Sequence, residues 1–91
     1  MLKFEWDARK ESSNRRKHGV TFEEALSVFA DPKALTFDDI VHSDFEDRSL
    51  TFGASSDGKL LVVVHTDRGD VIRIISARKA TSHEKHIYEE G

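Results

Sequence analysis

The chain has 91 residues, no cysteine and a formal net charge of −3 at pH 7. A chain of this length forms one domain, here residues 1–91, and buries only about 60–65% of its unfolded surface. The lack of cysteine excludes a disulfide framework and a thiolate metal site. No apolar run approaches the roughly 20 residues that cross a bilayer, and no leader-like apolar region follows Met1, so a cytoplasmic protein without membrane contact is expected.

Charge is segregated along the chain. Residues 1–20 carry six Lys/Arg against three Asp/Glu, residues 21–47 carry one against eight, and residues 48–91 carry seven against six. This pattern is compatible with solvated helix faces. It also allows a cationic face for phosphate and a separate acidic face for a basic protein partner, despite the negative net charge.

The N-terminal segment predicts a strand followed by a surface helix. Leu2–Trp6 alternates between apolar and polar residues, as a short strand does. Asp7 is a good N-cap for Ala8–Lys17, and Gly19 is a suitable left-handed C-terminal residue. Because this helix has almost no apolar stripe, its basic side chains are expected to be exposed.

A second helix and a short strand are predicted next. Thr21-Phe22-Glu23-Glu24 is a capping box that precedes an apolar helix face. Asp31-Pro32 ends this helix, because the residue before proline avoids helical geometry. Ala34–Phe37 is predicted as a short strand, and Asp38–Asp47 as an acidic, turn-like connection.

The remaining sequence predicts three more strands and a terminal helix. Arg48–Ser55 alternates, and Leu60–Thr66 and Val71–Ala77 are dense in β-forming residues. Thr81-Ser82-His83-Glu84 is a second capping box, which starts a helix through Tyr88. The predicted fold class is α+β: a small antiparallel sheet with two N-terminal helices and one C-terminal helix, in the order β-α-α-β-β-β-β-α.

Turn chemistry predicts which polar side chains meet. A three-residue loop, Asp67-Arg68-Gly69, would place His65 and Arg73 on one face. The alternative two-residue loop, Arg68-Gly69, is less favourable, because it would put Arg68 at positive φ. A two-residue turn at Asp57-Gly58 would bring Arg48 diagonally beside His65. The three residues then converge, and a one-residue shift in either hairpin would separate them.

This convergence suits cleavage of RNA without a metal. Clustered guanidinium groups bind phosphate and stabilise the charge that develops on it. A histidine such as His65 exchanges a proton near neutral pH. Glu46, in the acidic segment just before Arg48, is a candidate base or arginine-orienting group. The 2′-hydroxyl would attack its own phosphate and give a 2′,3′-cyclic phosphate, and DNA lacks that nucleophile.

Each candidate also has a structural interpretation. Arg48 can pair with an acidic neighbour at a strand end, and a histidine such as His65 is, taken alone, more often packed than catalytic. Arg73 can act as a strut beneath the acidic segment. His83 and His86 have the spacing of metal ligands on a helix, but the sequence offers no evident third ligand, so no metal or other cofactor is expected.

Three blocks of this sequence closely resemble the BrnT family of toxins from type II toxin-antitoxin systems. The blocks are Phe4-Glu5-Trp6-Asp7 with Lys10, Lys17-His18-Gly19-Val20 with Phe22-Glu23-Glu24-Ala25, and Arg73-Ile74-Ile75-Ser76-Ala77-Arg78-Lys79-Ala80 with Glu84 and Tyr88. The resemblance extends over nearly the whole chain. It implies a compact RelE-like fold, a ribonuclease that arrests translation, and neutralisation by a BrnA antitoxin that binds DNA and represses the shared operon.

Carried over by position, the resemblance implies a set of functional residues. The catalytic set is Glu46, Arg48, His65, Arg73 and Arg78, and the RNA-binding set is Lys17, His18, Lys79 and Tyr88. A hetero-oligomer with the antitoxin is expected, with DNA contacted only through that partner, and the acidic segment is a candidate docking site for a basic antitoxin. The alternative is a non-catalytic binding module that acts only in a DNA-binding complex with its antitoxin.

Overall fold

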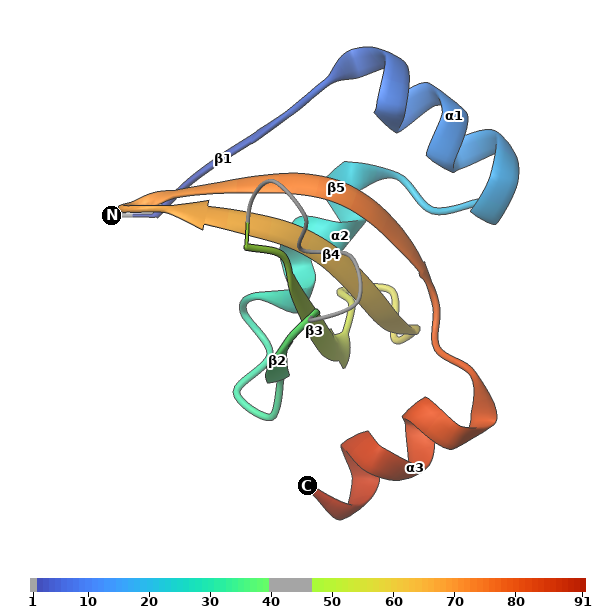
Figure 1. Cartoon of the computed structure of the whole chain (residues 1–91). Coiled ribbons are helices and arrows are strands. Elements are labelled where there is room, and N and C mark those ends of the chain that lie inside the picture. The colour runs from blue at the N-terminus through green and yellow to red at the C-terminus, as the bar shows by residue number, and fades with distance from the viewer. Residues whose placement is uncertain (1, 40–46) are drawn as a thin grey trace.

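The structure, a computed structural model, describes residues 2–39 and 47–91, and Figure 1 shows a sheet flanked by helices. In chain order the elements are β1 (Lys3–Trp6), α1 (Ala8–His18), α2 (Phe22–Val28), β2 (Leu35–Asp38), β3 (Ser49–Ala54), β4 (Leu60–Arg68), β5 (Val71–Lys79) and α3 (Ser82–Glu90). The five strands form one sheet in the order β1-β5-β4-β3-β2. The α+β class is therefore confirmed.

The sheet is mixed, and the prediction of a wholly antiparallel sheet is wrong. β1 runs parallel to β5, with Lys3 opposite Val71 and Trp6 opposite Ile74, whereas the other neighbouring strands are antiparallel. Hairpins join β3 to β4 and β4 to β5, and hairpins produce antiparallel pairs. β1 has no hairpin neighbour, because α1 and α2 follow it, and its partner comes from the far end of the chain.

The hydrophobic core lies between α2 and one face of the sheet. Phe22, Ala25 and Val28 of α2 are fully buried. α2 also approaches β3 so closely that a Cβ on Gly53 would lie 2.7 Å from Val28 Cγ1. Glycine is therefore required at this position for the helix to reach the sheet. The sheet contributes Leu61, Val63, Ile72, Ile74 and Ala77 to the same cluster.

Helix ends follow the capping signals in the sequence. Asp7 accepts hydrogen bonds from Arg9 N and Lys10 N, and Gly19 ends α1 with φ = 69°. The Thr21 side chain accepts a hydrogen bond from Glu24 N at the start of α2. No helix in the described ranges is long and apolar enough to cross a membrane.

Asn14 attaches α1 to the edge of β5. β1 pairs with β5 only as far as Ile74, so the backbone of Ala77 has no strand partner on that side. The Asn14 side chain takes its place: Nδ2 donates to Ala77 O at 2.8 Å, and Ala77 N donates to Oδ1 at 3.0 Å. Nδ2 also donates to Val20 O at 3.0 Å. This buried amide satisfies three backbone groups at once.

The β4–β5 hairpin turns at Gly69-Asp70, and the predicted three-residue loop is wrong. Arg68 pairs with Val71, which leaves two residues in the turn, and Gly69 has φ = 63°. A glycine with positive φ at the first central position is typical of the tight turns that match strand twist. As a result, Thr66 lies opposite Arg73.

The β3–β4 hairpin also differs in register from the prediction. Ser55 N donates to Lys59 O, so the loop holds three residues, and Ser49 lies opposite His65. A two-residue turn at Asp57-Gly58 with both φ angles positive would be needed for the predicted pairing. Only Gly58 has positive φ in this loop, at 79°.

α3 is held to the sheet and to the loop after α2 by two polar contacts. Arg78 of β5 forms a bidentate ion pair with Glu84, at 2.7 and 2.9 Å. Tyr88 donates its hydroxyl to Asp31 Oδ2 at 2.6 Å. Arg78, aided by the Thr81 backbone N–H, lowers the pKa of Glu84 to about 2. Thr81 and Glu84 form the predicted capping box, so one carboxylate both starts α3 and anchors it.

We predict that Asn14→Ala lowers the free energy of unfolding by about 2–4 kcal/mol, because it leaves buried backbone groups of Ala77 and Val20 without partners. Urea denaturation monitored by circular dichroism measures the change. Arg16→Ala on the exposed side of α1 is the control and should change stability by less than about 0.5 kcal/mol. Equal, small effects of both substitutions would contradict the edge-capping role.

The Arg78–Glu84 pair predicts a pH-dependent contribution to stability. Since the pKa of Glu84 falls from 4.5 to about 2 on folding, its stabilisation is complete above pH 4.5 and is lost as the pH falls towards 2. Glu84→Gln should therefore cost about 1–2 kcal/mol near pH 7, after allowance for solvent screening, and much less near pH 2. Urea titrations of both proteins across this range test it, with Glu89→Gln on exposed α3 surface as control. A Glu84→Gln effect that does not change with pH would contradict the ion-pair account.

Candidate functional site

A row of polar side chains crosses four neighbouring strand positions on the sheet face away from α2. Arg73 of β5 lies opposite Glu5 of β1 on one side and Thr66 of β4 on the other. Arg48 directly precedes β3, and its carbonyl accepts a hydrogen bond from Asp39 N at 2.8 Å, so the strand pairing continues through it. Because Ser49 faces His65, alternation places Arg48 level with Thr66. We call Glu5, Arg73, Thr66 and Arg48 the outer row.

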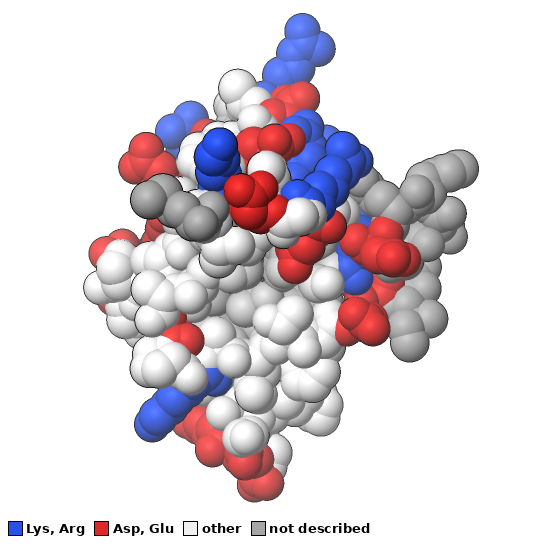
Figure 2. All heavy atoms as spheres, turned by 90° about the vertical axis from the view of Figure 1, so that its left-hand side faces the viewer, with Lys and Arg blue, Asp and Glu red and all other residues white. Residues whose placement is uncertain are grey.

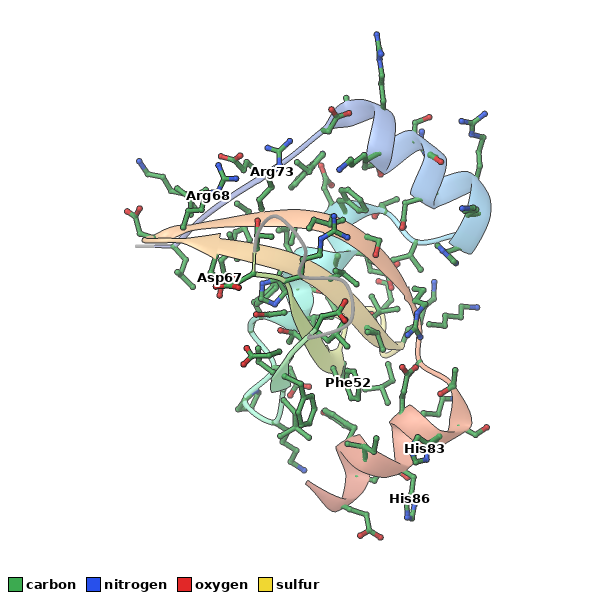
Figure 3. All side chains as sticks on the ribbon, in the orientation of Figure 1. Phe52, Asp67, Arg68, Arg73, His83 and His86 are labelled. Carbon is green, nitrogen blue, oxygen red and sulfur yellow. The ribbon has the colours of Figure 1, made fainter. Side chains whose placement is uncertain are left out.

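Arg73 is the accessible cation at the centre of the outer row. Its Nη1 donates to Glu5 Oε2 at 2.6 Å, and its side chain is 33% exposed. Figure 3 shows Arg73 and Arg68 on one side of the β4–β5 hairpin and Asp67 on the other. At about 4.8 Å per strand, the backbones of Arg48 and Arg73 lie about 10 Å apart. Two arginine side chains at this spacing can reach the same phosphate group.

The β1–α1 junction lies next to this row. The pKa of Asp7 is lowered, first by hydrogen bonds from Arg9 N and Lys10 N and further by the positive charges of Lys10 and Arg73. Asp7 therefore stays ionised while it caps α1. The same geometry brings the first turn of α1 close to the outer row.

His65 does not belong to this row, and its predicted convergence with Arg48 and Arg73 is wrong. His65 points to the α2 side of the sheet, where it is 1% exposed and contacts the Phe29 ring edge-on at 5.0 Å. The predicted registers would have turned it to the other face. The Gly69-Asp70 turn and the three-residue β3–β4 loop both shift the pairing, and each shift by an odd number of residues exchanges the faces.

His65 instead lies in the middle of a chain of side-chain hydrogen bonds. Its Nδ1 is 2.6 Å from Asp67 Oδ1, and its Nε2 is 2.7 Å from Thr51 Oγ1. Thr51 Oγ1 lies 2.9 Å from Thr36 Oγ1. The chain links β4, β3 and β2 beneath Phe29, and both ring nitrogens are occupied within it. We assign His65 a structural role, since nothing as large as RNA can reach it.

Three other predicted site residues lie apart from the outer row. Both terminal nitrogens of Arg78 bind Glu84, and the hydroxyl of Tyr88 binds Asp31, so these two side chains anchor α3. Lys79 is exposed at the end of β5. Glu46 lies outside the described residues. His83 and His86 project from α3, well away from the hairpin, as Figure 3 shows.

Lys17 and His18 meet a different part of the sheet. Together with Lys10, Ser13 and Asn14 of α1 and Ile75 and Ser76 of β5, they line a pocket of about 190 Å³. This pocket lies where α1 runs along the edge of β5. The structure therefore places the predicted RNA-binding residues of α1 beside the strand that carries Arg73.

The molecular surface near the hairpin tip has no single sign of charge. Figure 2 shows Lys and Arg side chains intermingled with Asp and Glu side chains in its upper part, and a broad uncharged area below them. A phosphate near this tip would consequently depend on particular cations more than on a general basic surface.

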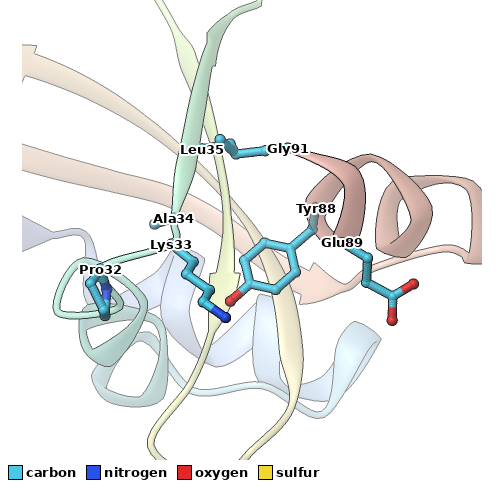
Figure 4. Close-up of a pocket in the computed structure, with 7 residues that line it drawn as sticks. All are labelled: Pro32, Lys33, Ala34, Leu35, Tyr88, Glu89 and Gly91. Atoms are coloured by element: carbon cyan, nitrogen blue, oxygen red, sulfur yellow. The ribbon is translucent and has the colours of Figure 1, made fainter.

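A larger hollow lies between the end of α3 and the loop before β2. Its volume is about 390 Å³, and it is lined by Pro32, Lys33, Ala34, Leu35, Tyr88, Glu89 and Gly91 (Figure 4). Its charged lining residues are one cation, Lys33, and one carboxylate, Glu89. Among the described residues, no three His, Cys, Asp or Glu side chains are grouped to hold a metal ion. The outer row is the better candidate for binding phosphate, because it brings two arginines to one face of the sheet.

Sequence reasoning missed three residues that shape this region. Glu5 and Thr66 flank Arg73, and Asn14 fixes the helix that carries Lys10 and Lys17. Glu5 stands on the polar side of an alternating strand, which is a usable signal only once β1 is known to neighbour β5. The role of Asn14 has no local signal, because its partner lies 63 residues away.

Comparison with known proteins agrees with the resemblance noted above. The family model described as the ribonuclease toxin BrnT of type II toxin-antitoxin systems matches residues 6–84. The crystal structure of the Brucella abortus ribonuclease toxin BrnT is similar, with a TM-score of 0.66 and 26% sequence identity, over 90% of this chain and 100% of that one. No curated protein matches the sequence. The chain thus belongs to the BrnT family of ribonuclease toxins from type II toxin-antitoxin systems.

Proposed function

We propose that this protein is a metal-independent endoribonuclease that cuts RNA at the outer row and thereby inhibits translation in the cytoplasm. The observation that carries the proposal is the shared face of Arg48 and Arg73 in a member of a ribonuclease family. Two guanidinium groups at this spacing suit a phosphodiester, which offers two non-bridging oxygens. We also propose that the fold of this chain is RelE-like, as its resemblance to the BrnT family implies.

The reaction begins with the RNA 2′-oxygen. It forms a bond to the adjacent phosphorus as the bond from phosphorus to the 5′-oxygen breaks, which gives a 2′,3′-cyclic phosphate. Arg48 and Arg73 hold the non-bridging oxygens and stabilise the additional negative charge of the transition state. The 2′-proton passes to a carboxylate, and water returns a proton to the leaving 5′-oxygen.

Glu5 is the described carboxylate best placed to assist. Its contact of 2.6 Å with Arg73 Nη1 orients the guanidinium, and its side chain is 49% exposed. It can therefore reach both Arg73 and a 2′-hydroxyl bound beside it. Glu46 is the second candidate base. His65 acts as a structural residue in this scheme, and Arg78 and Tyr88 position α3.

We predict that purified protein cleaves naked RNA in the presence of a metal chelator and leaves 2′,3′-cyclic phosphate ends. Arg73→Ala should lower kcat/KM by about 10²–10³-fold, since it removes a cation that acts on the transition state. Gel assays with end-group analysis measure both results. Arg68→Ala is the matched control, because it removes an arginine from the same face of the same hairpin, and it should retain most activity.

Three outcomes contradict this proposal in different ways. Equal losses for Arg73→Ala and Arg68→Ala would show that the outer row is not the cleavage site. Activity that disappears with the chelator would show a metal-dependent enzyme. Intact RNA after incubation with well-folded wild-type protein would favour the alternative function, a binding module that acts only with its antitoxin at DNA.

The antitoxin partner is proposed to dock on the acidic segment that begins at β2. Asp38 is exposed at the end of β2, which is an edge strand of the sheet, and Phe37 beside it is 44% exposed. An edge strand with an exposed aromatic and a carboxylate suits a basic segment of a BrnA-type antitoxin. DNA would then be contacted only through the antitoxin.

Charge reversal tests this docking site. The triple variant Asp38→Lys/Asp39→Lys/Asp44→Lys should weaken antitoxin binding at least tenfold in calorimetric titration, because attraction becomes repulsion. Asp57→Lys in the distant β3–β4 loop is the control and should bind as the wild type does. Unchanged affinity of the triple variant would place the antitoxin elsewhere.

A further inference from the structure

The pocket between α1 and β5 has the chemistry of an anion site. The residues that line it include Lys10, Lys17 and His18, which carry an ammonium or imidazole group, and Ser13 and Ser76, which carry a hydroxyl. None of the residues that line it carries a carboxylate. All of these groups can donate hydrogen bonds, and the lysines add full positive charges.

Helical periodicity gathers these side chains on one face of α1. Lys10 and Lys17 are seven residues apart, which is close to two full turns, so they point the same way. Asn14, between them, bonds to Ala77 and turns this face towards β5. Arg9 and Arg16 are also seven residues apart, but each lies about 100° around the helix from the lysine that follows it. Neither arginine lines the pocket, and both are exposed.

The pocket and the outer row share strand β5, which contributes Ser76 to the pocket and Arg73 to the row. Ser76 pairs with Val64, and Arg73 pairs with Thr66, so the extra residue, Ile75, forms a bulge between them. Since Val64 and Thr66 are two residues apart, Ser76 and Arg73 face the same side of the sheet about 7 Å apart along the strand. Neighbouring phosphates of one RNA strand can span that distance.

We propose that the α1–β5 pocket binds a backbone phosphate of the RNA strand next to the phosphate that is cleaved at the outer row. The proposal deepens the ribonuclease function and rests on it. Its volume of about 190 Å³ is below the ~300–1,000 Å³ of typical small-molecule sites. A phosphate group fits such a space better than a whole nucleotide. The interaction is independent of base identity, so it sets the path of the strand and not its sequence.

The test compares two double variants on α1. Lys10→Ala/Lys17→Ala removes the two pocket lysines, and Arg9→Ala/Arg16→Ala removes the same charge, at the same spacing, from positions on the same helix that do not line the pocket. Binding to a fully 2′-O-methylated RNA oligonucleotide, which has no free 2′-hydroxyl to attack, is followed by fluorescence anisotropy at several salt concentrations. Circular dichroism and thermal unfolding confirm that each variant is folded.

The pocket-side variant should bind roughly tenfold more weakly than the control variant, and its plot of log K against log salt should be shallower by ~0.7 for each phosphate that the protein no longer neutralises. With cleavable RNA its KM should rise while kcat at saturation stays the same, because the pocket does not touch the reacting atoms. Equal weakening by the two variants, or no weakening by either, would overturn the proposal.

Failure of the pocket and failure of the ribonuclease function give different results. If wild-type protein cleaves RNA but the two variants bind the methylated oligonucleotide equally, the pocket proposal is wrong and the function stands. If wild-type protein leaves RNA intact while the variants still differ in binding, the function is wrong and the pocket is a phosphate site.

Discussion

The tight turn at Gly69-Asp70 is the constraint on which the rest of this structure depends. It pairs Thr66 with Arg73 and so decides which side chains of β4 and β5 face α2. On the α2 side lies a packed interior with His65 in it. On the other side lies Arg73 between Glu5 and Thr66. Because side chains alternate along a strand, another turn length would exchange these two sets.

This division separates the buried hydrogen-bond chain of His65 from the outer row, in which Thr66 is buried while Glu5 and Arg73 meet solvent. In the Asp67–His65–Thr51 chain, both ring nitrogens of the buried His65 have a hydrogen-bond partner. A buried polar group without a partner would cost about 1–3 kcal/mol. Arg73 is one-third exposed and keeps an exposed carboxylate as partner. Such a pair costs little to rearrange around a phosphate. Arg73 and Glu5 are therefore the part of the outer row that a ligand in solution can reach.

Much of the fold could be predicted from sequence, because helix ends and strand composition are local signals. Asp7, Gly19 and the Thr81 capping box mark helix ends where the structure has them. Hairpin register could not be predicted, since it depends on which turn residue adopts positive φ. Neither could the parallel β1–β5 pair or the Asn14 edge cap, whose partners lie more than 60 residues apart.

The candidate site shows the same limits. Turn chemistry predicts that Arg48 and Arg73 share a face, and the register of the structure places them on one face. His65 was identified by the same reasoning, yet it lies on the other face, because two registers had to be right for it to join them. The resemblance to the BrnT family implies Arg78 as a site residue, and in the structure Arg78 forms an ion pair with Glu84.

Backbone NOEs between β4 and β5 in the isotopically labelled protein test the central claim most directly. We expect them to place Arg73 opposite Thr66 and Ile72 opposite Asp67. NOEs that instead place Arg73 opposite Val63 would bring His65 to the face of Arg73 and contradict the proposed division of the two faces.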